Sequence, residues 1–253
     1  MSRKDGKKTD YANWVSLKLI AVPGVIALGF TLVSLRWWGF AFAASAFLFI
    51  TVYFALARLT FSPSGDDVQA KVEGLVLAHL GTQTGTVLDI GCGNGPLTVA
   101  IAEKYPQTQV TGVDTWGKNW DYSQRLCERN AANAGVGERA VFQKASALQL
   151  PFADGQFDCV VSNLVFHEIR GLKDKREAVH EALRVLKPGG TFVLQDLFLI
   201  ESYYGKPDDL LKVVRGWGIR QVEFIRTCDE SFIPGLVKLP FMVGTMGMLV
   251  GKK

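Results

Sequence analysis

Two long apolar runs near the start of the chain constrain its folding more than any other feature. No charged residue occurs between Leu19 and Leu35 or between Trp37 and Ala57, and Arg36 alone separates the two runs. About 20 residues of helix cross the hydrocarbon core of a bilayer. The second run reaches that length, and the first does so if the ammonium group of Lys18 extends to the interface. The sequence therefore predicts an N-terminal transmembrane helical hairpin.

The charges around these runs predict how the chain is oriented in the membrane. Residues 1–18 carry five basic side chains against two acidic ones, whereas the link between the runs contributes only Arg36. Because positively charged flanks stay in the cytoplasm, both the N-terminus and the chain beyond the hairpin are expected on the cytoplasmic side. The basic residues of the flank are Arg3, Lys4, Lys7, Lys8 and Lys18.

The distribution of charge also argues against a nucleic-acid partner. The whole chain has a formal net charge of +4, of which residues 1–18 supply +3, so the remainder is close to neutral. Anionic lipid and membrane topology explain a basic cluster beside an apolar helix better than nucleic acid does. We therefore expect the lipid bilayer, and no nucleic acid, among the partners.

Other interpretations of the apolar runs are open. The link between them is short, so a monotopic hairpin that lies in one leaflet is one alternative. A hairpin buried in the core of a soluble protein is another, although helices that are apolar all round are rare there. A signal peptide is disfavoured because no small-residue cleavage site interrupts the apolar stretch.

After Ala57 the composition changes, and short apolar strands begin to alternate with helices. Such alternation predicts a doubly wound, mostly parallel α/β sheet, here with seven strands. We therefore divide the chain into a membrane-anchoring hairpin over residues 1–60 and an α/β domain over residues 61–253. The expected strands are 86–90, 109–113, 140–144, 157–162, 191–195, 220–225 and 244–250, and the expected helices are 66–80, 96–105, 123–134 and 174–185.

A glycine-rich turn, VLDIGCGNG at residues 87–95, follows the first of these strands. Its spacing is GxGxG rather than the GxGxxG of dinucleotide-binding turns. Asp89 would repel a pyrophosphate docked on the turn but would suit an ammonium group. Asp114 closes the second strand, where a carboxylate can accept both hydroxyls of a ribose. These two acids fit S-adenosylmethionine better than a nicotinamide dinucleotide.

Five motifs, in order along the chain, resemble those of the class I S-adenosylmethionine-dependent methyltransferases. VLDIGCGNG is similar to the first motif of that family, and VTGVD at residues 110–114 is similar to the second. Residues 145–152, 157–163 and 181–190 resemble the later ones. The resemblance covers about residues 66–200 and implies a Rossmann-like methyltransferase fold.

Matched position by position, the resemblance also implies a cofactor site. Asp89 and the backbone of Gly91 and Gly93 would hold the methionine end, Asp114 would hold the ribose, and the two residues after it would cover the adenine. The family often has an acid near Ser146, so adenine recognition is where this chain departs from the pattern. The expected cofactor-binding residues are Asp89, Gly91, Cys92, Gly93, Asp114, Thr115, Trp116, Ser146, Ala147 and Asn163.

The methyl acceptor should lie beyond the fourth and fifth strands. The sequence there is SNLVFHE, not the Asn/Asp-Pro-Pro-Tyr/Phe sequence of many enzymes that methylate nucleobases or glutamine. His167 is a candidate general base, with Glu168 or Asp196 to orient it or to stabilise a cationic amine. A turn residue packed near the cofactor is the alternative role for His167. Tyr203 and Tyr204 either wall the pocket or lie on the surface.

The sequence thus predicts a membrane-anchored methyltransferase that acts on a lipophilic small molecule or a lipid. Residues 232–241 are apolar and are either a lid facing the membrane or an ordinary buried connection. A nicotinamide-dependent oxidoreductase on the same fold and a non-catalytic membrane scaffold are the alternative functions. No metal is expected, because the cysteines lack CxxC spacing and do not cluster with histidines. They are Cys92, Cys127, Cys159 and Cys228.

Overall fold

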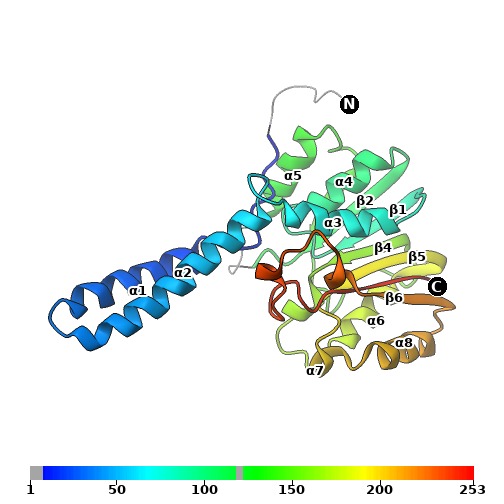
Figure 1. Ribbon diagram of the computed structural model, residues 1–253. Helices are drawn as coiled ribbons and strands as arrows, with labels where there is room; N and C mark the ends of the chain where they lie inside the picture. The colour runs from blue at the N-terminus through cyan, green and yellow to red at the C-terminus, as the bar shows by residue number, and fades with distance from the viewer. Residues whose placement is uncertain (1–7, 118–121) are drawn as a thin grey trace. The chain divides into compact units, whose positions relative to one another are not determined.

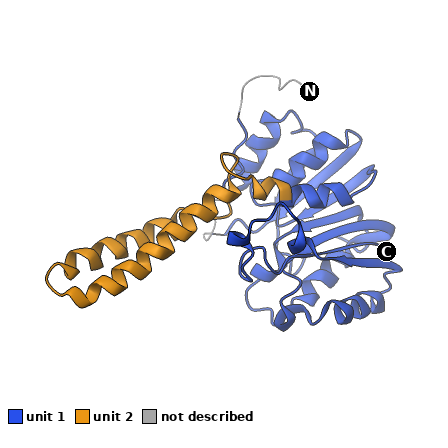
Figure 2. Ribbon diagram, viewed as in Figure 1, with its two compact units in different colours: residues 1–12, 72–253 blue, residues 13–71 orange. Residues whose placement is uncertain are grey.

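The computed structural model describes residues 8–117 and 122–253 of the chain (Figure 1). The described residues form two compact units, one of residues 8–12 with 72–117 and 122–253 and the other of residues 13–71 (Figure 2). Three basic residues of the predicted cytoplasmic flank, Arg3, Lys4 and Lys7, lie outside the described residues.

The smaller unit is a pair of apolar helices, α1 (Lys18–Ser34) and α2 (Ala41–Phe61), joined by the 3-10 turn η1 (Trp38–Phe40). The two helices pack side by side (Figure 2). The ring of Phe30 in α1 stacks on Phe40 and on Phe47, each with centroids 5.8 Å apart. Among the described residues, one helix, Trp38–Phe61, is long and apolar enough to cross a membrane, with a mean hydropathy of 2.1. With 17 residues, α1 is shorter. The helical hairpin is therefore present, and its insertion in a membrane stays a prediction.

The larger unit is built on one seven-stranded sheet in the order β3-β2-β1-β4-β5-β7-β6. Strands β1 to β5 pair in parallel, and β7 is antiparallel to both of its neighbours. The predicted mostly parallel, doubly wound sheet of seven strands is confirmed. The strands are β1 (Gly85–Ile90), β2 (Thr108–Asp114), β3 (Ala140–Lys144), β4 (Phe157–Asn163), β5 (Leu186–Asp196), β6 (Gln221–Ile225) and β7 (Gly247–Lys252).

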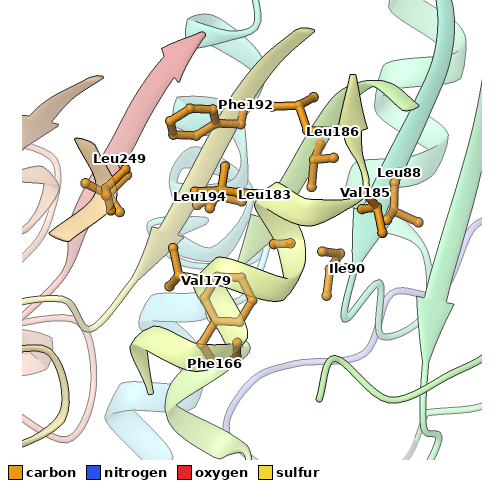
Figure 3. Packing of buried hydrophobic residues seen from close by; sticks show 14 of the residues in the cluster. Leu88, Ile90, Phe166, Val179, Leu183, Val185, Leu186, Phe192, Leu194 and Leu249 are labelled. Atoms are coloured by element: carbon orange, nitrogen blue, oxygen red, sulfur yellow. The ribbon is translucent and has the colours of Figure 1, made fainter. Parts of the chain in front are cut away.

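Helices cover both faces of the sheet because side chains alternate along each strand. Leu88 and Ile90 of β1 join the core beneath α6 (Arg176–Arg184) and α8 (Pro207–Gly216), as Figure 3 shows with Leu183 among them. Val87 joins the opposite core beneath α3 (Val68–His79), α4 (Pro96–Lys104) and α5 (Gln124–Asn133). Asp89 shares the face of Val87 and therefore points toward α4.

Two elements differ from the strands and helices expected above. β5 begins at Leu186, before the expected strand 191–195, because the N–H of Gly189 donates to the carbonyl of Lys253 at 2.7 Å and the N–H of Lys253 donates to the carbonyl of Gly190 at 3.0 Å. Lys253 thus extends the pairing of β5. The segment after β5 contains a short helix that was not expected, α7 (Glu201–Tyr204), in which Tyr204 is fully buried and Tyr203 is 37% exposed.

Candidate functional site

The glycine-rich turn after β1 requires glycine at its first position. Gly91 has a φ of +72°, and a Cβ added there would lie 2.1 Å from Cγ2 of Val165. The N–H of Gly91 donates to the carbonyl of Val113 in β2 at 2.7 Å. Since Val165 follows β4, the turn is fixed between β2 and the segment after β4. This is the point where the strand order reverses, which is where ligands bind in doubly wound sheets.

Asp89 is a buried carboxylate that pairs with no cation among the described residues. Its Oδ2 accepts a hydrogen bond from Oγ1 of Thr98, in the first turn of α4, at 2.6 Å. Burial, only partly offset by this hydrogen bond, raises the pKa of Asp89 to about 7, and the nearby charge of Asp114 acts in the same direction. A ligand cation would relieve both effects. The position therefore suits an ammonium group and opposes a phosphate.

Asp114, at the end of β2, is joined to the glycine turn by backbone hydrogen bonds. Its Oδ2 accepts from the N–H of Gly93 at 3.0 Å, and its Oδ1 accepts from the N–H of Trp116 at 2.8 Å. Burial raises the pKa of Asp114, and these hydrogen bonds oppose the rise. A backbone hydrogen bond from Thr115 acts in the same direction on that pKa. Since a carboxylate offers about four acceptor positions, capacity remains to accept from a ribose hydroxyl.

Trp116 is held against the turn in a strained backbone conformation. Its φ is +44°, and its indole Nε1–H donates to the carbonyl of Gly93 at 2.9 Å. The same carbonyl accepts from Sγ of Cys127 at 3.0 Å. An ammonium group only donates, so its backbone partner in this turn must be a carbonyl oxygen. The carbonyl of Gly93 already accepts from Trp116 and Cys127, which leaves the carbonyl of Gly91 as the better partner. Cys92 lies buried in the turn, and burial raises the pKa of its thiol, which stays neutral.

The remaining predicted cofactor residues lie at the same edge of the sheet. Thr115 is exposed directly after β2. Ser146 and Ala147 lie in the turn after β3, where Oγ of Ser146 accepts a backbone N–H from two residues further on at 3.2 Å. Asn163 ends β4, and its Oδ1 accepts from Nε2 of Gln195 at 2.8 Å. The fold therefore gathers the predicted residues at the ends of β1 to β4, as parallel strands require.

His167 and Asp196 form a hydrogen-bonded ion pair beyond β4 and β5. Nδ1 of His167 lies 2.8 Å from Oδ1 of Asp196, and its Nε2 lies 3.5 Å from Oε1 of Glu168. Oδ2 of the buried Asp196 accepts the N–H groups of Val165 at 2.9 Å and Phe166 at 2.6 Å. Because its oxygens are occupied in this way, Asp196 orients the imidazole and does not itself face a ligand.

The ion pair sets the protonation state of the imidazole. Burial on its own would lower the pKa of His167, but the charge of Asp196 and the hydrogen bond to it raise that pKa to about 10. The pKa of Asp196 is lowered in turn, despite its burial. At neutral pH the ring is therefore an imidazolium that donates from both nitrogens, and a base function for His167 would require a pH near 10.

Sequence reasoning missed three residues that shape this site. Thr98 binds Asp89, and Val165 excludes any side chain at Gly91. Pro96 at the start of α4 marks the first helical turn, so a hydroxyl two residues later could have drawn attention to Thr98. Nothing in the sequence pattern singles out Val165. Tyr204, which the sequence predicts to wall the pocket or to lie on the surface, is buried, and its hydroxyl donates to Asp196 at 3.2 Å.

The third missed residue is Asn130 in α5. Its Nδ2 donates to the carbonyl of Asn94, within the glycine turn, at 3.0 Å and to that of Asp10 at 2.8 Å, while its Oδ1 accepts the N–H of Asp10 at 2.9 Å. Asn130 thus ties the N-terminal segment to the turn. These contacts join residues 120 positions apart, which no local motif reveals.

Comparison with known proteins identifies the family. A family described as methyltransferase domain matches residues 88–194. The O-methyltransferase rstn1 of Aspergillus nomiae is 34% identical over 164 residues, which cover 57% of this chain and 68% of that protein. The chain belongs to the methyltransferase family.

A further relative matches a shorter part of the chain, and a solved structure shares its fold. The 27-O-demethylrifamycin SV methyltransferase of Amycolatopsis mediterranei is 35% identical over 130 residues, but the match spans 50% of this chain and only 44% of that relative. A crystal structure of geranyl diphosphate C-methyltransferase from Streptomyces coelicolor, with Mg²⁺, geranyl diphosphate and S-adenosyl-L-homocysteine, has a TM-score of 0.58 at 15% identity. The match covers 79% of this chain and 82% of that one, and it shows that the two proteins share a fold.

Proposed function

We propose that this protein is a membrane-anchored methyltransferase that transfers a methyl group from S-adenosylmethionine to a lipophilic small molecule or a lipid. The observation that carries the proposal is the pair of acids at the ends of two adjacent parallel strands. Asp89 and Asp114 flank a glycine turn, and neither is paired with a cation among the described residues.

The residues present fit this cofactor. Asp89 and the carbonyl of Gly91 would hold the ammonium group of the methionine end, and Asp114 would hold the ribose hydroxyls. Trp116, fixed on the carbonyl of Gly93, offers a ring to cover the adenine. The cofactor supplies an electrophilic methyl group on a sulfonium. The protein's own contribution is to place the acceptor in line with that group, since positioning accounts for much of the catalysis.

On the acceptor side, His167 would act as a fixed hydrogen-bond donor. The imidazolium held by Asp196 directs Nε2–H toward Glu168 and toward any acceptor oxygen that replaces it. Glu168 is half exposed, and the hydrogen bond from His167 lowers its pKa, so it is ionised at neutral pH. A neutral acceptor hydroxyl, such as a phenol, would lie between this donor and the ionised Glu168, and Glu168 would take the hydroxyl proton as the oxygen–methyl bond forms and the sulfur–methyl bond breaks.

The hairpin suggests the class of acceptor. We assign residues 1–60 to membrane anchoring and residues 61–253 to catalysis on the cytoplasmic side. The apolar length of Trp38–Phe61 and the exposure of its large side chains, among them Phe42 at 85% and Phe49 at 73%, support this assignment. An enzyme held at a bilayer meets molecules that partition there. A structural neighbour that binds geranyl diphosphate, an isoprenoid, is consistent with such an acceptor.

The two alternatives have less support. A nicotinamide dinucleotide would place its pyrophosphate on the glycine turn beside Asp89, which opposes a second negative charge. A non-catalytic scaffold would have no use for the ion pair that fixes His167 beside the cofactor turn.

Calorimetry with the protein in detergent tests the cofactor assignment. Wild-type protein should bind S-adenosylhomocysteine, and the variants Asp89→Ala and Asp114→Ala should each lose detectable binding. Asp208→Ala, which removes an exposed acid of α8, is the matched control and should bind as the wild type does. Intact binding in both site variants would reject the assignment, and binding of NAD in their place would support the oxidoreductase.

A further inference from the structure

The connection between β6 and β7 is an apolar loop close to the candidate site. We call residues 231–246 the β6–β7 loop; Lys238 is their only charged residue. In Figure 1 it is drawn in orange-red and includes the short turn η4 (Gly235–Val237). An apolar connection of this length normally folds its side chains inward, so its exposed residues call for an explanation.

The loop has a fixed shape. Its own backbone closes it, since the N–H groups of Met242 and Gly244 both donate to the carbonyl of Leu239, at 2.9 and 3.0 Å. Oγ1 of Thr245 donates to the carbonyl of Pro240 at 2.8 Å. The inner side chains of the loop are all at most 3% exposed: Ile233, Val237, Val243 and Met246. The core beneath the loop is therefore complete without its outer side chains.

Two large apolar side chains project from this rigid base. Phe241 is 65% exposed, the largest exposed fraction among the large apolar side chains described in residues 72–253, and Leu236 is 37% exposed. The exposed Lys238 lies between them in the sequence. The combination of apolar side chains with a single cation matches the composition of segments that enter the interface of an anionic bilayer.

The loop also lies beside the residues that hold His167. Gly247, which follows the loop directly, pairs with Asp196 in the register of β7 and β5. The N–H of Leu199, three residues after Asp196, donates to the carbonyl of Thr245 in the loop at 3.0 Å. A surface in contact with the tip of the loop would therefore lie next to the proposed acceptor side of the site.

We propose that the β6–β7 loop is a second membrane contact, in which Phe241 and Leu236 enter the boundary between headgroups and acyl chains while Lys238 stays with the headgroups. This inference rests on the proposed membrane anchoring, because the apolar helix Trp38–Phe61 in the same chain is what identifies the occupant as a bilayer. The contact would let an acceptor dissolved in the bilayer reach the site without crossing water.

Site-specific labelling of the full chain in lipid nanodiscs tests the proposal. The four native cysteines are buried, so a cysteine introduced by Phe241→Cys can be labelled with an NBD fluorophore. Val141→Cys is the matched control, because Val141 is 51% exposed but lies on β3, at the opposite end of the sheet from β6 and β7. Phe42→Cys, on α2 and 85% exposed, reports on the hairpin independently. The quencher is a lipid with a doxyl group on the upper part of its acyl chain.

We expect the doxyl lipid to quench most of the fluorescence of the labels at 241 and 42, and to leave the label at 141 nearly unchanged. If the label at 42 is quenched while those at 241 and 141 respond alike, the hairpin is in the bilayer and the loop contact is rejected. If neither 42 nor 241 is quenched, membrane anchoring fails and the loop contact fails with it. None of the three labels tests the cofactor site, which the calorimetric binding of S-adenosylhomocysteine tests separately.

Discussion

Replacing Gly91 by alanine tests whether the glycine turn is shaped by contact with the segment after β4. The new Cβ would lie 2.1 Å from Cγ2 and 2.5 Å from Cγ1 of Val165, in a residue whose φ is +72°. Gly135, after α5, has nearly the same φ, +75°, but nothing lies within 4 Å of its added Cβ. The two substitutions therefore share the conformational strain and differ only in the overlap.

The size of the difference follows from these contacts. A left-handed conformation costs a residue with a Cβ about 1–2 kcal/mol, which both variants incur. Forcing a methyl group into an occupied space costs about 1–3 kcal/mol more, which only Gly91→Ala incurs. If the turn moves to relieve the overlap, Asp89 and Asp114 lose their common geometry. We therefore expect Gly91→Ala to bind S-adenosylhomocysteine at least about tenfold more weakly than wild type, which corresponds to a loss of about 1.4 kcal/mol of binding free energy.

The assay combines thermal unfolding in detergent with calorimetry. Gly91→Ala should unfold at a lower temperature than Gly135→Ala and should bind S-adenosylhomocysteine more weakly, whereas Gly135→Ala should bind as the wild type does. Adding Val165→Ala removes both Cγ atoms and leaves Cβ at 2.8 Å, so the double variant should recover part of the loss. Equal behaviour of the two glycine variants, or no recovery with Val165→Ala, would refute the reasoning.

Two further predictions follow from buried contacts. The pKa of His167 is raised to about 10 and that of Asp196 is lowered, so their stabilising effect should be complete between about pH 4 and 6.5 and should decline as the pH rises toward about 10. The difference in unfolding temperature between wild type and His167→Gln, measured across pH, should follow that profile, and a difference that grows above pH 7 would contradict it. Asn130→Ala removes three hydrogen bonds and leaves the carbonyl of Asn94 without this donor, so it should cost about 1–3 kcal/mol of stability and weaken S-adenosylhomocysteine binding. Asn133→Ala is the control, because it removes one exposed hydrogen bond of 3.2 Å to the carbonyl of Lys8; it should change neither the stability nor the binding. Equal effects of the two variants in thermal unfolding and calorimetry would reject a link between the N-terminal segment and the turn.

The sequence predicted the sheet well because its central strands carry short runs of buried apolar residues. Val87, Leu88 and Ile90 of β1 lie directly before a glycine-rich turn, and that signal is local. The failures occurred where distant residues decide the structure. Residues 187–190 have the composition of a turn, yet the backbones of Gly189 and Gly190 form hydrogen bonds with Lys253, which is more than 60 positions later in the sequence. The helix α7 has only four residues, too few to show a periodicity.

For the candidate site, the sequence proposes residues that the fold brings to one edge of the sheet, but it does not give their protonation states. Asp89 and Asp114 stand at strand ends and His167 in the turn after β4, positions that motif spacing indicates. The raised pKa of His167 depends on Asp196, 29 residues away, whose oxygens are oriented by backbone amides. The sequence therefore suggests a base at His167, whereas the folded geometry indicates a hydrogen-bond donor. The second apolar helix was also predicted, but its length alone identifies no membrane.

Methyl transfer to a membrane extract tests the central claim most directly. Full-length protein would be incubated with membranes and S-adenosylmethionine that carries an isotopic label in its methyl group, with Asp89→Ala as the inactive reference and Asp208→Ala as the active one. We predict that label enters the lipid-soluble fraction with wild-type protein and Asp208→Ala, and not with Asp89→Ala, and that mass spectrometry of the labelled product identifies the acceptor. Label confined to water-soluble products would contradict a lipophilic acceptor, and equal labelling with Asp89→Ala would contradict the cofactor site itself.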